Sequence, residues 1–355
     1  MGWIGIRGPA ERRFRRSADP ATPGAVLTRG TLRIEATALP GAVPQNLVRY
    51  ATRDPRPAGV TLVLDVDGTL RLLMRRGDRT LAAAVPTGLT DSPECAILSY
   101  AWDGPARHGA LTVWLPDRRI LHHSHIGSPL EPSLQDARRM ACGTDRITVA
   151  PSVGLMTLSD ATEPAGPLPG IAAGALVETA TGPRPIETLR PGDIVRTQDG
   201  GDAQIRWQGS VCLPARGRLA PMVLRAPYHG LTRDLVVTGD QRVALAGSEV
   251  EYLFGEERVA VAARHLLGRH SAEPVTPVSP LMTWHQILLD RHEVMIVNGA
   301  PVESLDARAV LTDPAVLPAS VLRDMPAELR PRDTRLALPV LQGYEAVTLQ
   351  SVALG

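Results

Sequence analysis

Prolines and glycines divide this chain into short segments along almost its whole length. Each type occurs 32 times among the 355 residues, and both are spread along the chain. Because both residues mark turns and interrupt helices, the apolar segments between them stay short. Short segments in which apolar and polar residues alternate are typical of β-strands. The sequence therefore predicts a mainly β protein, and its length is enough for two domains with cores of their own.

The first half carries one series of strands, which we place at 28–160 after an N-terminal arm at 1–27. The segment 60–76 has Asp67-Gly68 between two apolar runs, a strong signal for a tight hairpin turn. A short helix is predicted at 133–141. The other strands of this series are predicted at 31–39, 46–52, 95–103, 110–124 and 152–160.

A second series of strands follows a linker. The segment 161–169 holds three prolines and is the best linker in the chain. Short strand-like runs then continue through 170–306. From 307 to 355 the spacing of apolar residues changes, and helices are predicted at 314–325 and 341–354. We therefore expect two β domains and a helical C-terminal tail.

The charged residues exclude two classes of function. The formal net charge is +1, which argues against a general role in binding nucleic acids. All 38 basic residues are arginines. A chain without lysine cannot form a Schiff base or supply the lysine of a Walker-type phosphate site.

The cysteines and the apolar runs bear on location. Cys95, Cys142 and Cys212 are far apart and odd in number, which predicts neither a CxxC metal site nor a disulfide framework. The N-terminal stretch shows no apolar core of a signal peptide, and no apolar run approaches the ~18 residues of a membrane span. We expect a cytoplasmic protein without a membrane span, with non-classical export as the alternative.

The stretch LVLDVDGTL at 62–70 matches the DxDGT signature and resembles phosphatases of the haloacid-dehalogenase type. In that family the first aspartate, here Asp65, is a nucleophile and the second, Asp67, is a general acid beside Mg²⁺. Such a site needs a parallel strand that leads into a helix, whereas the residues after Asp67 predict another strand. The family's usual lysine is also missing. A hairpin turn is the favoured interpretation, and a phosphatase is the alternative.

Several ordered motifs occupy the second half. The first is GALVETATGPRPIETLRPGDIVRT at 174–197, in which Pro191-Gly192 forms a turn before a strand. Further blocks stand at 205–211, 225–245, 261–267 and 283–305. Together they resemble the bacterial form of the Hint (Hedgehog/intein) module, at about 168–306. The resemblance implies an all-β, horseshoe-like domain at 170–306 and, in that family, self-cleavage.

Two positions that the resemblance makes catalytic carry the wrong residue. Self-cleavage begins when a thiol or hydroxyl on the first residue attacks the preceding carbonyl, and a histidine assists the breakdown of the amide. The first position aligns with Gly170, which has no side chain. In the family's Thr-x-x-His motif Thr238 is kept, but Gln241 replaces the histidine and cannot shuttle a proton near neutral pH. We therefore name no confident catalytic residue and expect no self-cleavage.

Other polar residues of this half are expected to support the fold. The resemblance implies that His265, His285 and His292 converge within the Hint domain. A hydrogen bond between His285 and Asp290 is predicted as an orienting contact. A structural role is favoured for all of them, because they have no nucleophile to serve.

The strand series at 28–160 loosely resembles laminin-G-like or concanavalin-like β-sandwiches. Such sandwiches often bind carbohydrates or peptides through loops that can hold Ca²⁺. Asp103, His108 and Asp117 are polar candidates in loops, but no calcium-loop pattern surrounds them. A carbohydrate-binding sandwich would expose a groove lined by aromatic residues such as Tyr100, Trp102 or Trp114.

A histidine cluster at 122–125 and a basic stretch at 12–16 are the remaining candidates. His123 and His125 would share one face of a strand with His122 on the other, but no third metal ligand is evident. A solvated strand edge is the favoured interpretation. We therefore expect no metal and no cofactor, and a solvated terminus at 12–16.

The favoured function is a degenerate Hint protein that binds a protein or carbohydrate partner, or has a structural role. The first alternative is an autoprocessing protein with displaced chemistry and a cut near 169/170. The others are a carbohydrate-binding sandwich and the phosphatase described above.

Overall fold

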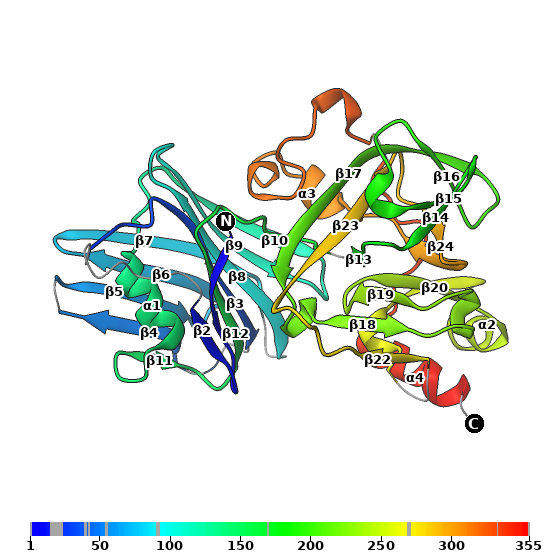
Figure 1. The fold of residues 1–355 in the computed structure, drawn as a ribbon. Helices are drawn as coiled ribbons and strands as arrows, with labels where there is room; N and C mark the ends of the chain where they lie inside the picture. The colour runs from blue at the N-terminus through cyan, green and yellow to red at the C-terminus, as the bar shows by residue number, and fades with distance from the viewer. Residues whose placement is uncertain are drawn as a thin grey trace. The chain divides into compact units, whose positions relative to one another are not determined.

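The chain forms two units in the computed structural model (Figure 1). The first unit comprises Met1–Gly166 and Asp313–Ser320, and the second comprises Pro167–Thr312 and Val321–Gly355. The structure describes residues 2–14, 24–38, 41, 43–53, 56–89, 93–168, 170–267, 271–331 and 333–353.

The first unit contains two antiparallel sheets. The larger has the order β10-β9-β8-β3-β12-β1-β2, and the smaller has the order β11-β4-β5-β6-β7. The strands are β1 (Trp3–Arg7), β2 (Arg12–Phe14), β3 (Arg29–Ala38), β4 (Gln45–Thr52), β5 (Ala58–Leu64), β6 (Thr69–Arg76), β7 (Arg79–Pro86), β8 (Glu94–Asp103), β9 (His108–Leu115), β10 (Ile120–Ile126), β11 (Ile147–Val149) and β12 (Val153–Ser159).

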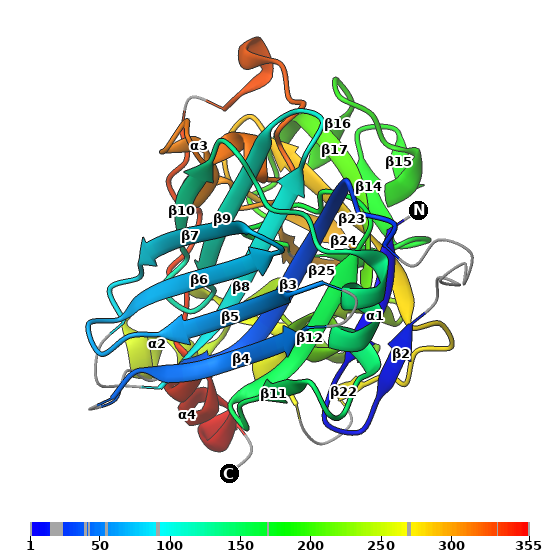
Figure 2. The ribbon, with the colours of Figure 1, turned by 90° about the vertical axis from the view of Figure 1, so that its left-hand side faces the viewer.

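The two sheets pack face to face as a β-sandwich. Figure 2 shows β4 to β7 side by side in front of β3, β8 and β12. Alternate residues of β6 are buried, so that Leu70 and Leu72 join Ile34 and Leu98 of the other sheet in one core. This alternation is what a strand with one face toward the core and one toward solvent requires. The sandwich expected for this half is confirmed.

A helix, α1 (Leu134–Cys142), covers part of the larger sheet. Its N-terminus is capped by Ser133, whose hydroxyl accepts a hydrogen bond from the Asp136 backbone nitrogen at 3.0 Å. Tyr50 donates to the Asp136 carboxylate at 2.6 Å and ties the helix to β4. The helix predicted at 133–141 is confirmed.

The turn at Asp67-Gly68 joins β5 and β6 as an antiparallel hairpin. Gly68 has φ of +75°, a conformation that glycine adopts without strain. The backbone nitrogen of Thr69 donates to the Asp67 carboxylate at 2.8 Å, and Arg71 pairs with Asp65 at 2.8 Å. Both aspartates therefore stabilise the hairpin, and the strand-to-helix geometry of a DxDGT phosphatase site is not formed.

The N-terminal residues differ from the expected arm. Trp3–Arg7 is a buried strand that pairs with β12 on one side and β2 on the other. The basic stretch at 12–16 lies partly in β2, and Arg15 and Arg16 lie outside the described residues. Composition does not identify this strand, because its partner is more than 150 residues away in the sequence.

The second unit is built on a 13-stranded sheet with the order β21-β20-β25-β24-β14-β16-β17-β23-β13-β19-β18-β22, in which β15 pairs with β14. Its longest pairing joins β17 and β23. The strands are β13 (Ile171–Ala172), β14 (Leu176–Thr179), β15 (Gly182–Pro185), β16 (Ile194–Arg196), β17 (Asp202–Pro214), β18 (Pro221–Leu224), β19 (Leu235–Thr238), β20 (Arg242–Ala246), β21 (Arg258–Ala262), β22 (Ala272–Pro274), β23 (Leu281–Leu289), β24 (Val294–Val297) and β25 (Ala300–Glu303).

Short helices and helical turns complete the second unit. Among the described residues, no helix is both long and apolar enough to cross a membrane. These elements are α2 (Ser248–Phe254), α3 (Arg308–Leu311), α4 (Gly343–Ala353), η1 (Ile186–Thr188), η2 (Gly217–Leu219), η3 (Tyr228–Gly230), η4 (Ala263–His265) and η6 (Ala327–Leu329).

The C-terminal tail is only partly helical. The helix predicted at 341–354 is present as α4, and its Ala346 and Leu349 join the core of the second unit. The helix predicted at 314–325 is wrong, because the structure has there only the short 3₁₀ turn η5 (Leu317–Ala319). Pro318 has no N–H and cannot donate to a continuing α-helix.

Candidate functional site

The predicted first residue of the Hint module is buried at the centre of the second unit. Strand β13 follows Gly170 directly and pairs with β19 on one side and β23 on the other. The Gly170 backbone nitrogen donates to the Thr238 hydroxyl at 3.0 Å, and the Thr238 nitrogen donates back to the Gly170 carbonyl at 2.9 Å. The structure thus brings together two of the three positions that the motif singled out.

The space beside Gly170 is occupied by Trp284. A Cβ atom placed on Gly170 would lie 2.6 Å from the Trp284 Cβ and 2.9 Å from its Cγ. These separations are shorter than real Cβ contacts, and Trp284 is 1% exposed in a strand paired on both edges. Glycine is therefore the residue that this packing accommodates. The sequence analysis missed Trp284, because the motif at 283–305 does not show that this side chain packs against Gly170.

Gln241 is held by backbone groups rather than by Gly170. Its side-chain amide donates to the Glu303 carbonyl at 3.0 Å, and it is 4% exposed. Its own backbone nitrogen donates to the Thr238 carbonyl at 3.1 Å. The residue at the histidine position is therefore a buried link between the turn after β19 and strand β25.

A group of buried charged residues lies beyond Gln241. Arg242 pairs with Glu303 at 2.6 Å, and Asp306 is 3.9 Å from the same guanidinium group. His292 lies with its Nε2 atom 3.6 Å from Glu303, and its Nδ1 atom accepts a hydrogen bond from the Ala337 nitrogen at 3.0 Å. Removing one partner of a buried ion pair leaves an uncompensated charge, so these side chains depend on one another within the fold.

Asp240 is a second residue that the sequence reasoning missed. It lies inside the Thr-x-x-Gln motif and pairs with Arg218 at 2.8 Å and with Arg264. Burial alone would raise the pKa of Asp240, but the two guanidinium groups lower it below its ordinary value. The carboxylate is therefore ionised at neutral pH and stabilises the turn that carries Thr238 and Gln241.

The predicted hydrogen bond between His285 and Asp290 is wrong. The Nδ1 atom of His285 lies 3.4 Å from the Gln208 amide nitrogen, and the Asp290 backbone nitrogen donates to the Gln204 carbonyl at 3.2 Å. Five residues of extended chain span ~16 Å, which separates the two side chains along β23. Burial lowers the pKa of His285, while the charge of Glu187 opposes this shift.

The three histidines that the sequence analysis singled out in this unit have different neighbours. His265 lies beside Gly343, His285 beside Gln208, and His292 beside Ala337. A structural role for each of them stays a prediction.

The aromatic groove expected of a carbohydrate-binding sandwich does not form. Tyr100, Trp102 and Trp114 are 2%, 1% and 7% exposed. The Trp102 indole nitrogen donates to the Leu27 carbonyl at 2.6 Å, and the Tyr100 hydroxyl donates to the Leu130 carbonyl at 3.0 Å. Tyr100 and Trp102 belong to the sandwich core, and Trp114 is buried as well, so none of the three rings is exposed to a ligand.

The loop and histidine candidates of the first unit are held by other groups. Burial would raise the pKa of Asp103, but a hydrogen bond from the Ala106 nitrogen and the charge of Arg29 lower it. Strand β10 is at an edge of the larger sheet, and its His125 ring is 4.9 Å from that of His108. Burial and the neighbouring His125 lower the pKa of His123. Within the part of the chain that the structure describes, no three acidic, histidine or cysteine residues form a metal site.

Comparison with known proteins assigns part of the chain to a family. Residues 169–309 match the family model of the Hint domain. Among solved structures, a bacterial intein-like domain from Clostridium thermocellum has 13% sequence identity and a TM-score of 0.29, covering 39% of this chain and all of the other. The MchDnaB-1 intein has 13% identity and a TM-score of 0.27, covering 38% of this chain and 99% of the other.

The first half has similar structures of another kind. The CBM40 module of a Ruminococcus gnavus IT-sialidase, bound to α2,6-sialyllactose, has 15% identity and a TM-score of 0.26. The matched region covers 44% of this chain and 90% of the CBM40 chain. No curated protein sequence matches the chain.

Proposed function

We propose that the Hint domain at 169–309 no longer cleaves the chain and is kept as a rigid structural or binding module. The observation that carries this proposal is the packing of Trp284 against Gly170. The domain has lost the nucleophile, and a tryptophan occupies the space that a nucleophilic side chain would need. Position 170, with a glycine packed against Trp284, serves the packing of the domain and cannot supply the attacking atom.

The remaining polar groups do not replace the lost chemistry. An acyl shift needs an oxygen or sulfur atom that can attack the carbonyl before residue 170. The Thr238 hydroxyl is the polar side-chain group bonded to Gly170, and it accepts a hydrogen bond from the Gly170 nitrogen. The Gln241 amide donates to a carbonyl in β25 and has no basic nitrogen.

The partner in this proposal is a protein or a carbohydrate. Burial of Tyr100, Trp102 and Trp114 excludes these aromatic residues as a sugar-binding platform. A carbohydrate partner would therefore be recognised by exposed polar groups of the first unit.

Intact-mass spectrometry of the purified chain tests the proposal. The protein is incubated for days with and without a thiol that would release a thioester. A single species at 38.0 kDa is expected under both conditions. Two fragments that separate near Gly170 would show that the chain cleaves itself.

If fragments appear, a variant in which Thr238 is replaced by Val shows whether the Thr238 hydroxyl is needed for the cut. Loss of cleavage in Thr238→Val would identify that hydroxyl as a displaced nucleophile. Thr283→Val is the matched control, because Thr283 is exposed on β23.

A further inference from the structure

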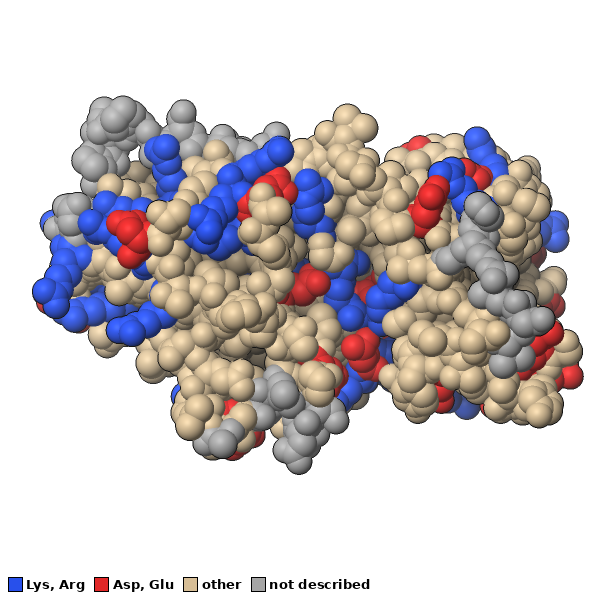
Figure 3. All heavy atoms as spheres, turned by 90° about the horizontal axis from the view of Figure 1, so that it is seen from below, with Lys and Arg blue, Asp and Glu red and all other residues tan. Residues whose placement is uncertain are grey.

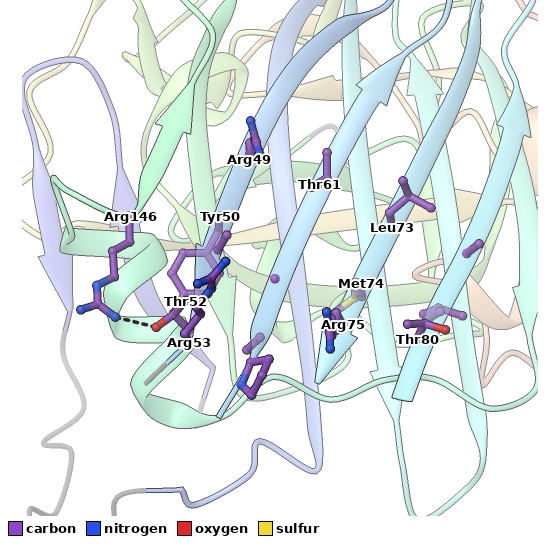
Figure 4. A pocket seen from close by; sticks show the side chains of 16 residues that line it. Arg49, Tyr50, Thr52, Arg53, Thr61, Leu73, Met74, Arg75, Thr80 and Arg146 are labelled. Atoms are coloured by element: carbon purple, nitrogen blue, oxygen red, sulfur yellow. Dashed lines mark hydrogen bonds between the residues drawn. The ribbon is translucent and has the colours of Figure 1, made fainter. Parts of the chain in front are cut away.

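The outer face of the smaller sheet in the first unit carries a hollow of about 1050 Å³. Its walls come from β4, β5, β6 and β7, with Arg146 immediately before β11 (Figure 4). This is the face turned away from the sandwich core, and Figure 2 presents it toward the viewer.

The strand register places the lining side chains in rows across the sheet. Arg49 is opposite Thr61, Thr61 is opposite Leu73, and Leu73 is opposite Ala82. Residues directly opposite each other point to the same face of an antiparallel sheet. This first row therefore runs across four strands on the solvent side.

A second row runs beside the first. Ala51 is opposite Gly59, and Gly59 is opposite Arg75. At the sheet edge, the Ala51 nitrogen donates to the Arg146 carbonyl at 3.1 Å and brings Arg146 to the end of this row. The small residues in the middle leave the hollow between the two arginines.

Four arginines line the hollow, and no acidic residue is among the described residues that line it. Within the described residues, the side chains of Arg49 and Arg53 have no hydrogen bond or ion pair. The Arg75 Nε atom donates to the Gly77 carbonyl at 3.0 Å, and a terminal nitrogen of Arg146 donates to the Thr52 hydroxyl at 2.6 Å. Most of the donors on these guanidinium groups remain available.

Arg71, a neighbouring arginine on the same face, does have a carboxylate partner, so on this face the lack of such partners is local to the hollow. Arg71 lies one row away on β6 and pairs with Asp65 at 2.8 Å. Among the described residues, the arginines of the hollow have no such carboxylate apart from the exposed Asp145, which lies 3.5 Å from Arg146. Figure 3 shows arginine side chains gathered at the left edge of the molecule, over the first unit.

The floor between the arginines is suited to a hydroxyl-rich ligand. It has the hydroxyls of Thr61 and Thr80, the small residues Ala51 and Ala82, and an apolar patch at Leu73, which is 49% exposed. Tyr50 is 1% exposed, so no aromatic ring faces the hollow from the described lining residues. Single-stranded nucleic acids bind mainly by stacking their bases on such rings.

The spacing of the charged residues favours an extended ligand. Neighbouring strands lie ~4.8 Å apart, so three steps in the order β11-β4-β5-β6 separate the strands beside Arg146 and Arg75 by ~14 Å. A ligand with several acidic groups along its length can contact arginines at both ends of the hollow. Guanidinium groups bind carboxylates and sulfates through paired hydrogen bonds.

We propose that this hollow, lined by Arg49, Arg53, Arg75 and Arg146, binds an anionic oligosaccharide, a short sugar chain that carries carboxylate or sulfate groups. The arginines bind the acidic groups, the threonines contact sugar hydroxyls, and Leu73 contacts the apolar face of a ring. The site is in the first unit, so its test is independent of whether the Hint domain cleaves.

Isothermal titration of the full chain tests the proposal with four probes of similar length. They are hexagalacturonate, a heparin hexasaccharide, neutral maltohexaose and a poly-dT hexanucleotide. Binding of either acidic sugar, with affinity that falls as salt rises, is expected, and the stronger of the two identifies the acidic group. Equal binding of maltohexaose, stronger binding of the nucleotide, or binding of none of the probes would overturn the assignment.

Variants locate the site on this face. Replacing Arg75 by Ala is expected to weaken binding about tenfold, because one charge-assisted contact is lost. Ala82→Glu keeps all four arginines and is expected to weaken binding by at least as much, because it adds a negative charge to the exposed floor. Arg71→Ala is the matched control, with expected affinity within about twofold of the parent chain.

Unchanged affinity in both Arg75→Ala and Ala82→Glu would place the ligand elsewhere and overturn the proposal. Circular dichroism melting curves confirm that each variant is folded before it is titrated.

Discussion

At the scale of single residues, the proposed loss of cleavage rests on packing as well as on chemistry. Gly170 lacks the attacking atom, and Trp284 also fills the space beside it. The two changes reinforce each other, because restoring a side chain at 170 would displace a tryptophan that is 1% exposed. Gln241 has a further role, since its amide joins β25 to the turn after β19.

Gly170→Cys is predicted to destabilise the protein without producing cleavage. The added Cβ would lie 2.6 Å from the Trp284 Cβ, and overpacking of this kind costs about 1–3 kcal/mol in the free energy of unfolding. Urea denaturation measures the change, and intact mass shows whether fragments appear. Gly201→Ala is the control, because its nearest contact would be an ordinary 3.4 Å.

Adding Gln241→His to Gly170→Cys is predicted to leave the chain intact as well. Efficient cleavage in this double variant would show that the packing around Trp284 does not block the reaction.

The sequence predicted which motif positions form this site, but it did not predict the side-chain packing around them. Ordered motifs placed Gly170, Thr238 and Gln241 together, and the structure joins Gly170 to Thr238 by two hydrogen bonds. Trp284 was not predicted, because its overlap with Gly170 depends on the pairing of β13 with β23. The hydrogen bond between His285 and Asp290 was wrongly predicted, since extended chain holds residues five positions apart away from each other.

At the scale of elements, one carboxylate joins three turns of the second unit. Asp240 follows β19, Arg218 lies in η2, and Arg264 lies in η4. Strands of alternating residues could be predicted from the sequence, and most of those in the first unit were. The strand β1 was missed, because its five residues WIGIR are too short a pattern to predict a strand without knowledge of their pairing with β12.

The ion pairs of Asp240 predict a loss of stability in acid. The pKa of this carboxyl is lowered below its ordinary value of 3.8 in the folded state, so the unfolded state binds the proton more readily. The contribution is complete above about pH 5 and is lost as pH falls through 3.8 toward the lower folded pKa. Chemical denaturation between pH 7 and pH 3 measures this dependence.

Asp240→Asn is predicted to lower the free energy of unfolding at pH 7 by about 1–3 kcal/mol and to flatten its fall in acid. Asp199→Asn is the control, since that carboxylate is 62% exposed and pairs with Arg258 at the surface. An unchanged acid profile in Asp240→Asn would contradict the assignment of the effect to Asp240.

At the scale of the whole molecule, the net charge does not show that four arginines lie together at the hollow on the smaller sheet. The formal charge of +1 argued against binding anions in general, and it sums acidic and basic groups over all 355 residues. The hollow on the smaller sheet has four arginines and no acidic residue among its described lining residues. This site could not be predicted, because the register of five strands brings its arginines together.

The residues after Thr312 belong to both units and several of them are buried. Val316 and Ser320 are fully buried in the first unit, and Leu322 and Ala346 are fully buried in the second. A chain that ends after Thr312 is therefore predicted to melt more than about 10 °C below the full chain. A chain that ends after Ser351 is the control and should melt close to the parent in differential scanning calorimetry.

The return of the chain from the second unit to the first changes what a cut at 169/170 could achieve. Residues Asp313–Ser320 belong to the first unit, and the Ala165 nitrogen donates to the Ala319 carbonyl at 2.7 Å. A nicked molecule would keep its N-terminal fragment bound to this segment, which stays covalently part of the C-terminal fragment. Cleavage would thus open the backbone while the two fragments stay joined through this segment of the first unit.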